Sequence, residues 1–328
     1  MKSYNIGIND AGQRVDKFVT KLCQGLPKSM LYKYIRIKRI KVNKKRTEIG
    51  YMLKENDLVE LYINDEFFAE EEADMSFMDA DGVLDVVYED ENILIVNKPA
   101  GVIVHEDNNI KGNTLVDSIK KYLYNKGEYN PQEENTFAPA LCNRIDRNTS
   151  GLVIAAKTAA ALREMAEKIR TGQTHKYYYC LVMGTPYPKE ADLFSYLVKN
   201  DAENRVHIFD EKVEGAREIH TEYKTVESFG WGSILEINLH TGRPHQIRAH
   251  LAHIGYPVAG DTKYGNPGFN KKIGLSYQVL SAYKLKFDFD DNSGELGYLK
   301  GKTVCLDKDK CGVFKTAKKC GERTGYNK

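Results

Sequence analysis

Apolar positions follow two different periods along this chain. Near the start they recur every three or four residues, which predicts two helices, and then alternate with polar residues, which predicts a strand. Past residue 83 the apolar runs mostly have the length of strands, with two further segments of helical spacing. The predicted helices lie within residues 15–22, 31–35, 159–170 and 244–254, and the predicted strands lie at 58–63, in a hairpin within 86–102, and at 152–156, 175–184 and 233–239.

Charge and composition divide the chain into four parts. Residues 12–64 form a first domain, and residues 65–82 are acidic and poor in apolar residues, which is typical of an interdomain linker. Residues 83–299 hold the strand-rich second domain. Residues 300–328 are rich in lysine and poor in core residues, so we expect a flexible basic tail. The acidic residues of the linker are Asp65, Glu66, Glu70, Glu71, Glu72, Asp74, Asp79 and Asp81.

A basic run dominates the first domain. Nine lysines and arginines lie between positions 28 and 46, with tyrosines among them and no acidic residue. Such a surface is typical of phosphate binding and predicts contact with nucleic acid. The alternative is a solvated helix face with salt bridges, but this segment has no acidic partners. The nine residues are Lys28, Lys33, Arg36, Lys38, Arg39, Lys41, Lys44, Lys45 and Arg46.

Composition limits the remaining classes of protein. The chain has 328 residues, 41% of them hydrophobic and 29% charged, as expected for a two-domain globular protein. Neither a signal peptide nor an apolar run long enough to cross a bilayer is evident, so we expect no membrane association and a cytoplasmic location. The six cysteines form no Cys-x-x-Cys pair, which favours reduced thiols over disulfides or a zinc knuckle.

The stretch from Asn143 to Gly151 contains the first candidate for chemistry. It is a polar loop that leads into the buried strand at 152–156, and it places Asp146 between Arg144 and Arg147. A surface turn with a local ion pair is the simpler interpretation of such a sequence. Because the loop adjoins a buried strand, however, neighbouring groups could orient the carboxylate and set its pKa.

A second candidate lies between His240 and Gly255. Thr241 suits the cap of a helix, Pro244 suits its first turn and Gly255 its end, and Arg248 lies beside the apolar stripe of that helix. Four histidines invite a metal site, but there is no His-Glu-x-x-His and no companion ligand at metal spacing, so we expect no metal. The four are His240, His245, His250 and His253.

Several segments, in the same order, resemble the RluA-type RNA pseudouridine synthases. Residues 143–151 are similar to the family signature His-Arg-Leu-Asp-Arg-x-Thr-Ser-Gly, with Asn143 in place of the histidine. Asn-Lys-Pro-Ala-Gly at 97–101, the Lys-x-Tyr motif ending at Tyr178 and Gly-Arg-x-His-Gln-Ile-Arg at 242–248 also resemble the family. The first domain resembles the S4-like RNA-binding domain, except that Lys38 and Lys44 replace glycines where a positive φ would cost strain.

The resemblance implies an α+β fold with a mixed, largely antiparallel central sheet, a cleft across it and a small N-terminal S4-like domain. It also implies isomerisation of uridine to pseudouridine, which requires neither a cofactor nor a metal. Asp146 would attack C1′ or C6 of a flipped-out uridine, Arg248 would orient that carboxylate, and Tyr178 would stack on the uracil or assist proton removal from C5. Arg144, Arg147, Lys98 and His245 would contact RNA, with Arg144 filling the gap left by the flipped base.

The expected partner is RNA, with ribosomal RNA of the large subunit first and transfer RNA as the alternative; we expect a monomer. A competing hypothesis is a non-catalytic RNA-binding or ribosome-assembly protein that retains the fold. The carboxylate of Asp146 argues against it, because a pure binder gains nothing from an acid beside an anionic ligand. A histidine-dependent metal hydrolase is a second alternative, which stoichiometric zinc in the purified protein would reveal.

Overall fold

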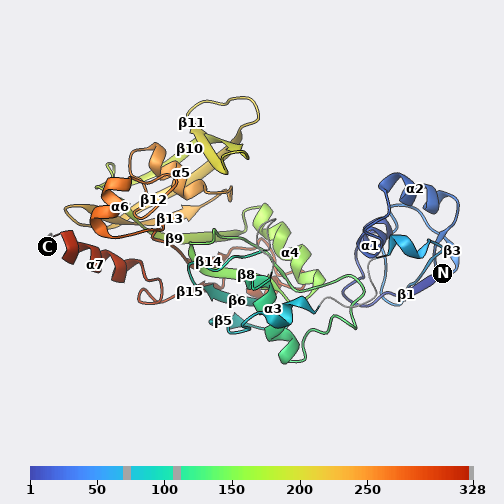
Figure 1. Ribbon diagram of the computed structural model, residues 1–328. Helices are drawn as coiled ribbons and strands as arrows, with labels where there is room; N and C mark the ends of the chain where they lie inside the picture. The colour runs from blue at the N-terminus through green and yellow to red at the C-terminus, as the bar shows by residue number, and fades with distance from the viewer. Residues whose placement is uncertain (69–74, 106–111, 325–328) are drawn as a thin grey trace.

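The computed structural model describes residues 1–68, 75–105 and 112–324, which form two units joined end to end (Figure 1). The N-terminal unit is a four-stranded antiparallel sheet in the order β1-β4-β2-β3, with two helices packed on it. Phe18 and Val19 of the first helix and Leu31 of the second are buried in its core, as their spacing predicts. The elements are β1 (Lys2–Asn5), α1 (Val15–Leu22), α2 (Lys28–Arg36), β2 (Ile40–Val42), β3 (Lys45–Arg46) and β4 (Leu58–Leu61).

An 11-stranded sheet forms the second unit. Its main path runs β11-β10-β12-β13-β9-β14-β8-β6-β5, with β15 paired to β14 and β7 paired to β8. The pairing of β14 with β8 is parallel and the others are antiparallel, which confirms the predicted mixed, largely antiparallel sheet. The strands are β5 (Val86–Glu89), β6 (Ile93–Lys98), β7 (Ala140–Leu141), β8 (Ser150–Ala156), β9 (Thr174–Met183), β10 (Glu190–Asn200), β11 (Arg205–Phe209), β12 (Arg217–Ser228), β13 (Gly232–Leu239), β14 (Leu280–Phe287) and β15 (Thr303–Cys305).

Helices cover both faces of this sheet and form two cores. Strand side chains alternate between the faces, so the adjacent residues Tyr178 and Tyr179 lie in different cores. One core includes side chains of α4, α6 and α7, and the other includes those of α3 and α5. The helices are α3 (Leu115–Asn125), α4 (Ala159–Arg170), α5 (Gln246–His253), α6 (Pro267–Ile273) and α7 (Val313–Thr324), with short 3₁₀ turns η1 (Asp65–Phe67), η2 (Ser76–Asp79) and η3 (Gly297–Leu299).

The expectation of a flexible tail after residue 300 is wrong. Strand β15 extends the sheet, and α7 packs on it with Val313, Ala317 and Cys320 almost completely buried. Their spacing is that of one helix face, which the intervening lysines concealed. The second unit therefore continues to residue 324; residues 325–328 lie outside the described part of the chain.

The segment 65–82, which we predicted to be an acidic linker, is partly packed against the second unit. Phe77, in η2, is fully buried and contacts the rings of Tyr124 and Tyr129, so the end of the segment belongs to the core of the second unit. The acidic residues between positions 69 and 74 lie outside the described residues.

Direct hydrogen bonds join the two units. The buried carboxylate of Asp10 accepts from Asn135 Nδ2 and Thr136 Oγ1, each over 2.7 Å. Arg163 of α4 donates to the carbonyl of Ala11 over 3.1 Å. The position of the N-terminal unit against the larger sheet is thus set by polar contacts as well as by the chain connection.

No helix among the described residues is long and apolar enough to cross a membrane.

Candidate active site

Asp146 lies in the loop between β7 and β8, and β8 pairs with β14 and β6 inside the large sheet. The loop is a tight turn in which Thr149 N donates to the carbonyl of Asp146, and Gln278 donates to Thr149 Oγ1. Gly151 follows with φ +111°, and a Cβ there would lie 2.1 Å from the carbonyl oxygen of Ala282. Only glycine allows this close pairing of β8 with β14, which fixes where the loop leaves the sheet.

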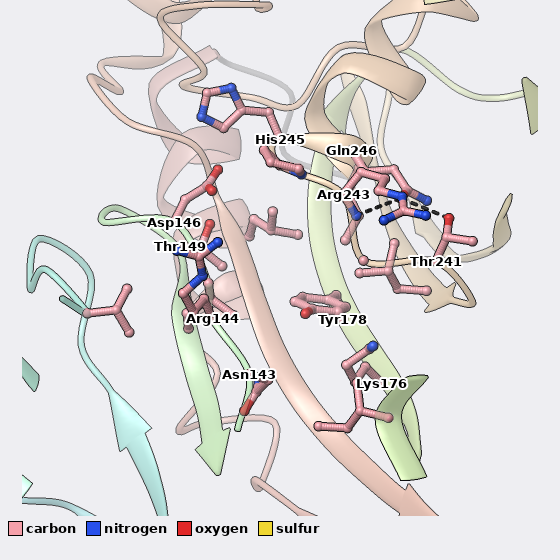
Figure 2. Close-up of a pocket in the computed structure, with 18 of the residues that line it drawn as sticks. Asn143, Arg144, Asp146, Thr149, Lys176, Tyr178, Thr241, Arg243, His245 and Gln246 are labelled. Atoms are coloured by element: carbon pink, nitrogen blue, oxygen red, sulfur yellow. Dashed lines mark hydrogen bonds between the residues drawn. The ribbon is translucent and has the colours of Figure 1, made fainter. Parts of the chain in front are cut away.

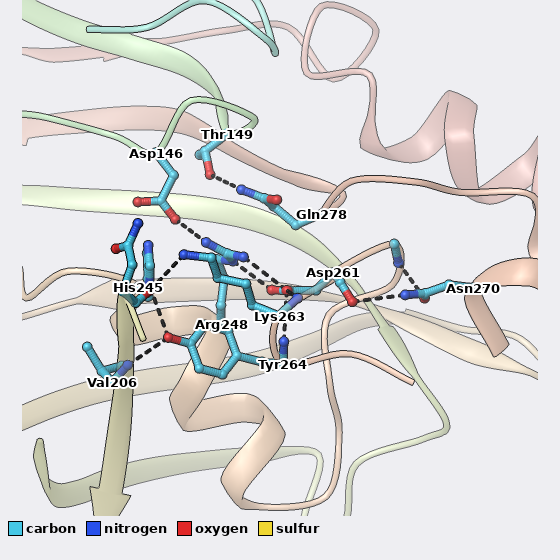
Figure 3. Close-up of polar contacts among 12 residues, drawn as sticks. Asp146, Thr149, Val206, His245, Arg248, Asp261, Lys263, Tyr264, Asn270 and Gln278 are labelled. Carbon is cyan, nitrogen blue, oxygen red and sulfur yellow. Dashed lines mark hydrogen bonds and ion pairs between the residues drawn. The ribbon is translucent and has the colours of Figure 1, made fainter. Parts of the chain in front are cut away.

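Arg248 reaches Asp146 from helix α5. Ile247 and Leu251 anchor the helix in the core, while the Arg248 side chain is only 6% exposed. Its Nη1 donates to Oδ2 of Asp146 over 2.7 Å, and its Nε and Nη2 donate to the two oxygens of Asp261 over 2.6 and 2.9 Å (Figure 3). One guanidinium therefore joins two carboxylates that are far apart in the sequence.

Asp261 holds the guanidinium of Arg248 in place. Its side chain is completely buried, and the backbone amides of Lys263 and Tyr264 also donate to it. Burial alone would raise the pKa of Asp261, but the hydrogen bonds and charge of Arg248 hold it below its usual value. Burial would likewise lower the pKa of Arg248, yet Asp261 and Asp146 raise it. The pair thus stays ionised and presents one remaining donor edge to Asp146.

Tyr178 lies on β9 between Ile237 of β13 and Ala282 of β14, with its ring turned into the cavity beside Asp146 (Figure 2). The residue is 5% exposed. Burial, followed by the nearby charge of Asp146, raises the pKa of Tyr178. The ring is therefore neutral near pH 7 and offers a flat apolar surface with a protonated hydroxyl.

A cavity of about 750 Å³ lies over these groups and is large enough for a nucleoside. The predicted catalytic and cleft residues meet at its wall, although they come from separate parts of the sequence (Figure 2). Those that line it are Arg144, Asp146, Arg147, Tyr178, His245 and Arg248.

Comparisons with known proteins agree with this geometry. Residues 92–253 match the family described as RNA pseudouridylate synthase. The ribosomal large subunit pseudouridine synthase C of Vibrio parahaemolyticus is 32% identical over 86% of this chain and 87% of its own length. The protein of that name from Escherichia coli strain K12 is 32% identical over 88% of each chain. The chain belongs to the RNA pseudouridine synthase family.

The fold agrees as well. A solved structure of human RNA pseudouridylate synthase domain containing 4 superposes with a TM-score of 0.55 at 20% identity, covering 73% of this chain and 92% of that one. The predicted α+β pseudouridine synthase fold is confirmed, and so is membership of a family of isomerases that act on RNA.

Asn143 stands where this synthase departs from the family signature, and its role is structural. Its Oδ1 accepts a hydrogen bond from the backbone amide of Ile154 over 2.8 Å, which ties the start of the loop to β8. Asn143 therefore still fixes the orientation of the loop through its side chain. Unlike the histidine of the family signature, it does not titrate.

Lys98, which we expected to contact RNA, has its ammonium turned into the protein. It is fully buried, and its ammonium donates to the backbone carbonyls of Pro99, Val102 and Arg147 over 2.8 to 2.9 Å. Because Arg147 is next to Asp146 in the loop, Lys98 holds that loop against the turn after β6. Burial lowers the pKa of Lys98 to about 8, and Asp146 works against this effect.

Helix α5 begins later than the sequence indicated. It starts at Gln246, with His245 before it in the left-handed region at φ +52°. Thr241 does not cap the helix; it accepts from the amide of His220 and donates to the side chain of Gln246. His245 borders the cavity, and its Nδ1 lies 2.9 Å from the hydroxyl of Tyr264. Burial lowers the pKa of His245.

The four histidines near α5 do not converge on one metal. His250 is buried between Thr221 and Ser195, and His253 pairs with Asp210. In the described part of the chain, one group could ligate a metal: Asp192, His220 and His240 have ligand atoms within 4.8 Å of one another. The two imidazoles are stacked at 5°, and each already contacts a carboxylate, so these side chains form a hydrogen-bond network.

All nine residues of the basic run at 28–46 lie on α2, β2, β3 or the turns between them. Eight are exposed and Lys41 is partly buried. Within the described ranges none forms an ion pair, while Arg39 and Lys41 lie over the rings of Tyr34 and Tyr62. Lys38 and Lys44 adopt φ +63° and +62°, as their alignment with glycines predicted.

Two further residues were not selected from the sequence. Asp261 lies in the segment Gly-Asp-Thr-Lys-Tyr after α5, and only the fold shows that it reaches Arg248. Lys176 is the lysine of the Lys-x-Tyr motif, and its position two residues before Tyr178 places both side chains on the same face of β9.

Proposed function

We propose that this enzyme converts one or a few uridines of large-subunit ribosomal RNA to pseudouridine, with Asp146 as the nucleophile. The observation that best supports this role is that Arg248 binds one oxygen of the Asp146 carboxylate at the edge of a nucleoside-sized cavity. The other oxygen, Oδ1, accepts no hydrogen bond from the described residues. The choice of ribosomal RNA follows the names of the relatives from Vibrio parahaemolyticus and Escherichia coli.

The reaction requires a uridine extruded from its stack and a base that can turn while still bound. If Asp146 attacks C1′, it displaces N1 and is itself displaced when C5 joins C1′. If it adds to C6, the bond between N1 and C1′ breaks, C5 joins C1′, and Asp146 is then eliminated from C6. On either route C5 loses its proton and N1 gains one. Arg248 keeps the carboxylate ionised and aimed. Tyr178 supplies the surface on which uracil stacks, and its raised pKa favours this role over that of a phenolate base.

Basic side chains outside the cavity would hold the RNA. Arg144 and Arg147 are exposed at the mouth of the cavity, where Arg144 can fill the gap left by the flipped base and Arg147 can contact phosphate. His245 would contact the target nucleotide from the opposite wall. The S4-like N-terminal domain, with the nine basic residues of the run at 28–46, would bind a neighbouring RNA element. The proposal retains a monomer in the cytoplasm, as the sequence suggested.

The decisive experiment is pseudouridine mapping, by carbodiimide-stop sequencing, of total RNA from cells with and without the gene. The expected result is loss of one or a few sites in large-subunit ribosomal RNA and their return with the wild-type gene but not with Asp146→Asn. Lost sites confined to transfer RNA would reassign the substrate. If no site changes and the purified enzyme modifies no RNA, the non-catalytic alternative is correct.

A further inference from the structure

Lys176 places a largely buried cation in the wall of the cavity. The residue is 9% exposed, and its ammonium is turned toward the cavity on the same side as Tyr178 (Figure 2). Among the described residues, Lys176 forms neither a hydrogen bond nor an ion pair through its side chain. Burial alone lowers its pKa, with no neighbouring carboxylate acting against the effect.

The comparison with Lys98 shows that this arrangement is unusual within the same fold. Lys98 is also buried, but three backbone carbonyls accept the three protons of its ammonium. A buried charge without such partners is costly. Because the fold provides these partners for one lysine and leaves the other unpaired beside the active-site cavity, the partner of Lys176 is expected to come from the substrate.

The surroundings of Lys176 place that partner on the base of the target nucleotide. Asp146 and Lys176 lie on opposite sides of the Tyr178 ring (Figure 2). The chain at Gly242 passes over the ammonium, since a Cβ on that glycine would lie 3.7 Å from Nζ. A uridine whose sugar carbon faces Asp146 and whose ring lies on Tyr178 has its 4-oxo group on the side away from Asp146.

We propose that Lys176 is a catalytic residue that donates to O4 of uracil and stabilises the negative charge that develops there. This inference rests on the proposed function, but it holds for either route of attack. If Asp146 displaces uracil from C1′, the electron pair of the broken bond spreads from N1 to O2 and O4. If Asp146 adds to C6, the electrons of the C5–C6 double bond move to C5 and O4. A largely buried ammonium stabilises such charge more than it stabilises the neutral base.

The test separates the chemical step from binding. Wild type, Lys176→Met and Lys176→Arg are compared in single-turnover reactions with a synthetic RNA that carries the mapped uridine. We expect Lys176→Met to lower the rate constant by about 100-fold, as for other donors to a developing oxyanion, with little change in Kd. Lys272→Met is the matched control: it removes one exposed positive charge on α6, outside the cavity, and should change neither the rate constant nor Kd.

Two further measurements exclude other roles for the lysine. A structural lysine would reduce thermal stability when replaced, whereas Lys176→Met should leave Tm unchanged or raise it, because an unpaired buried charge is removed. RNA with neutral methylphosphonate linkages on either side of the target should show the same Lys176→Met defect as ordinary RNA. A defect that disappears with a neutral linkage would make Lys176 a phosphate ligand and overturn the proposal.

The outcome also separates this inference from the proposed function. If wild-type enzyme makes no pseudouridine, the proposed function fails. If wild type is active and Lys176→Met reacts at the wild-type rate, or loses only affinity, the function stands and the role of Lys176 in charge stabilisation is wrong.

Discussion

Arg248 Nη1 and Asp146 Oδ2 lie 2.7 Å apart, and this single contact engages one edge of the guanidinium and one oxygen of the carboxylate. The rest of the guanidinium is held by Asp261. The positive charge of Arg248 is therefore already balanced by a buried partner, and the contact orients Asp146 without neutralising it. Because Asp261 balances the charge of Arg248 and Arg248 orients Asp146, two predictions about the active site follow.

Asp146→Asn should abolish isomerisation and leave RNA affinity within about threefold. The amide keeps the shape of the side chain but is a far poorer nucleophile, and Arg248 remains balanced by Asp261. Product formation by mass spectrometry and affinity by filter binding on the same RNA measure the two effects. Isomerisation at the wild-type rate by this variant would exclude Asp146 as the nucleophile.

Asp261→Asn should lower the rate constant by about 10- to 100-fold through loss of positioning. Without the carboxylate of Asp261, the guanidinium of Arg248 has Asp146 as its remaining acidic partner. A tighter ion pair with Arg248 would move the carboxylate of Asp146 out of line and make it a weaker nucleophile. Asp261→Glu should recover part of the rate.

The control for this prediction is Glu236→Gln, which breaks a partly buried pair with Lys284 away from the cavity. It should change stability without lowering the rate constant of the reaction. An Asp261→Asn enzyme with the wild-type rate constant and only a lower Tm would reduce Asp261 to a structural role.

Lys98→Met should destabilise the protein by about 3 kcal/mol or more, because each buried carbonyl left without its donor costs roughly 1–3 kcal/mol. The carbonyls of Pro99, Val102 and Arg147 would lose their common donor. Urea unfolding measures the change, and Lys45→Met, which is exposed, should stay within about 0.5 kcal/mol of wild type. Equal stability of the two variants would show that the three hydrogen bonds contribute nothing net.

Replacing Lys44, Lys45 and Arg46 by alanine should weaken RNA binding and reduce its dependence on salt. Each lost phosphate contact lowers the slope of log K against log salt by about 0.7–0.9, so three contacts should lower it by about 2–3. The single-turnover rate constant at saturating RNA should not change. An unaltered slope would mean that this surface does not meet the RNA backbone.

The buried imidazole of His250 should make the protein less stable as the pH falls below neutrality. Burial lowers the pKa of His250 from 6.5 to about 4, so between these values the unfolded chain binds a proton that the folded chain does not. The loss accumulates from pH 6.5 to about 4 and reaches at most about 3 kcal/mol. His250→Gln should show a correspondingly smaller loss over this window in thermal unfolding; identical pH profiles would contradict the assignment.

How far the sequence predicts this structure depends on the range of the interactions involved. The Asp146 loop, the strand after it and the alternation of Tyr178 follow from local pattern and resemblance. The burial of Lys98 does not, because its three acceptors are chosen by the path of the backbone. Helix α7 was missed because lysines on its outer face dominate its composition, although Val313 and Ala317 mark its buried stripe.

The site itself shows the same division. Local sequence indicates which residues carry charge, but the pairing of Arg248 with Asp261 and the isolation of Lys176 arise only when α5 and β9 are placed on the sheet. A charge without a partner is a property of the three-dimensional arrangement, so no sequence pattern predicts it.

The hydrogen bonds of Asp10 to Asn135 and Thr136 hold the N-terminal unit in a set position relative to the second unit. They fix the distance between the basic face of the N-terminal unit and the cavity at Asp146. A uridine is then selected partly by its separation from the RNA element that the basic face binds, so two RNAs with the same local sequence but different spacing present different substrates.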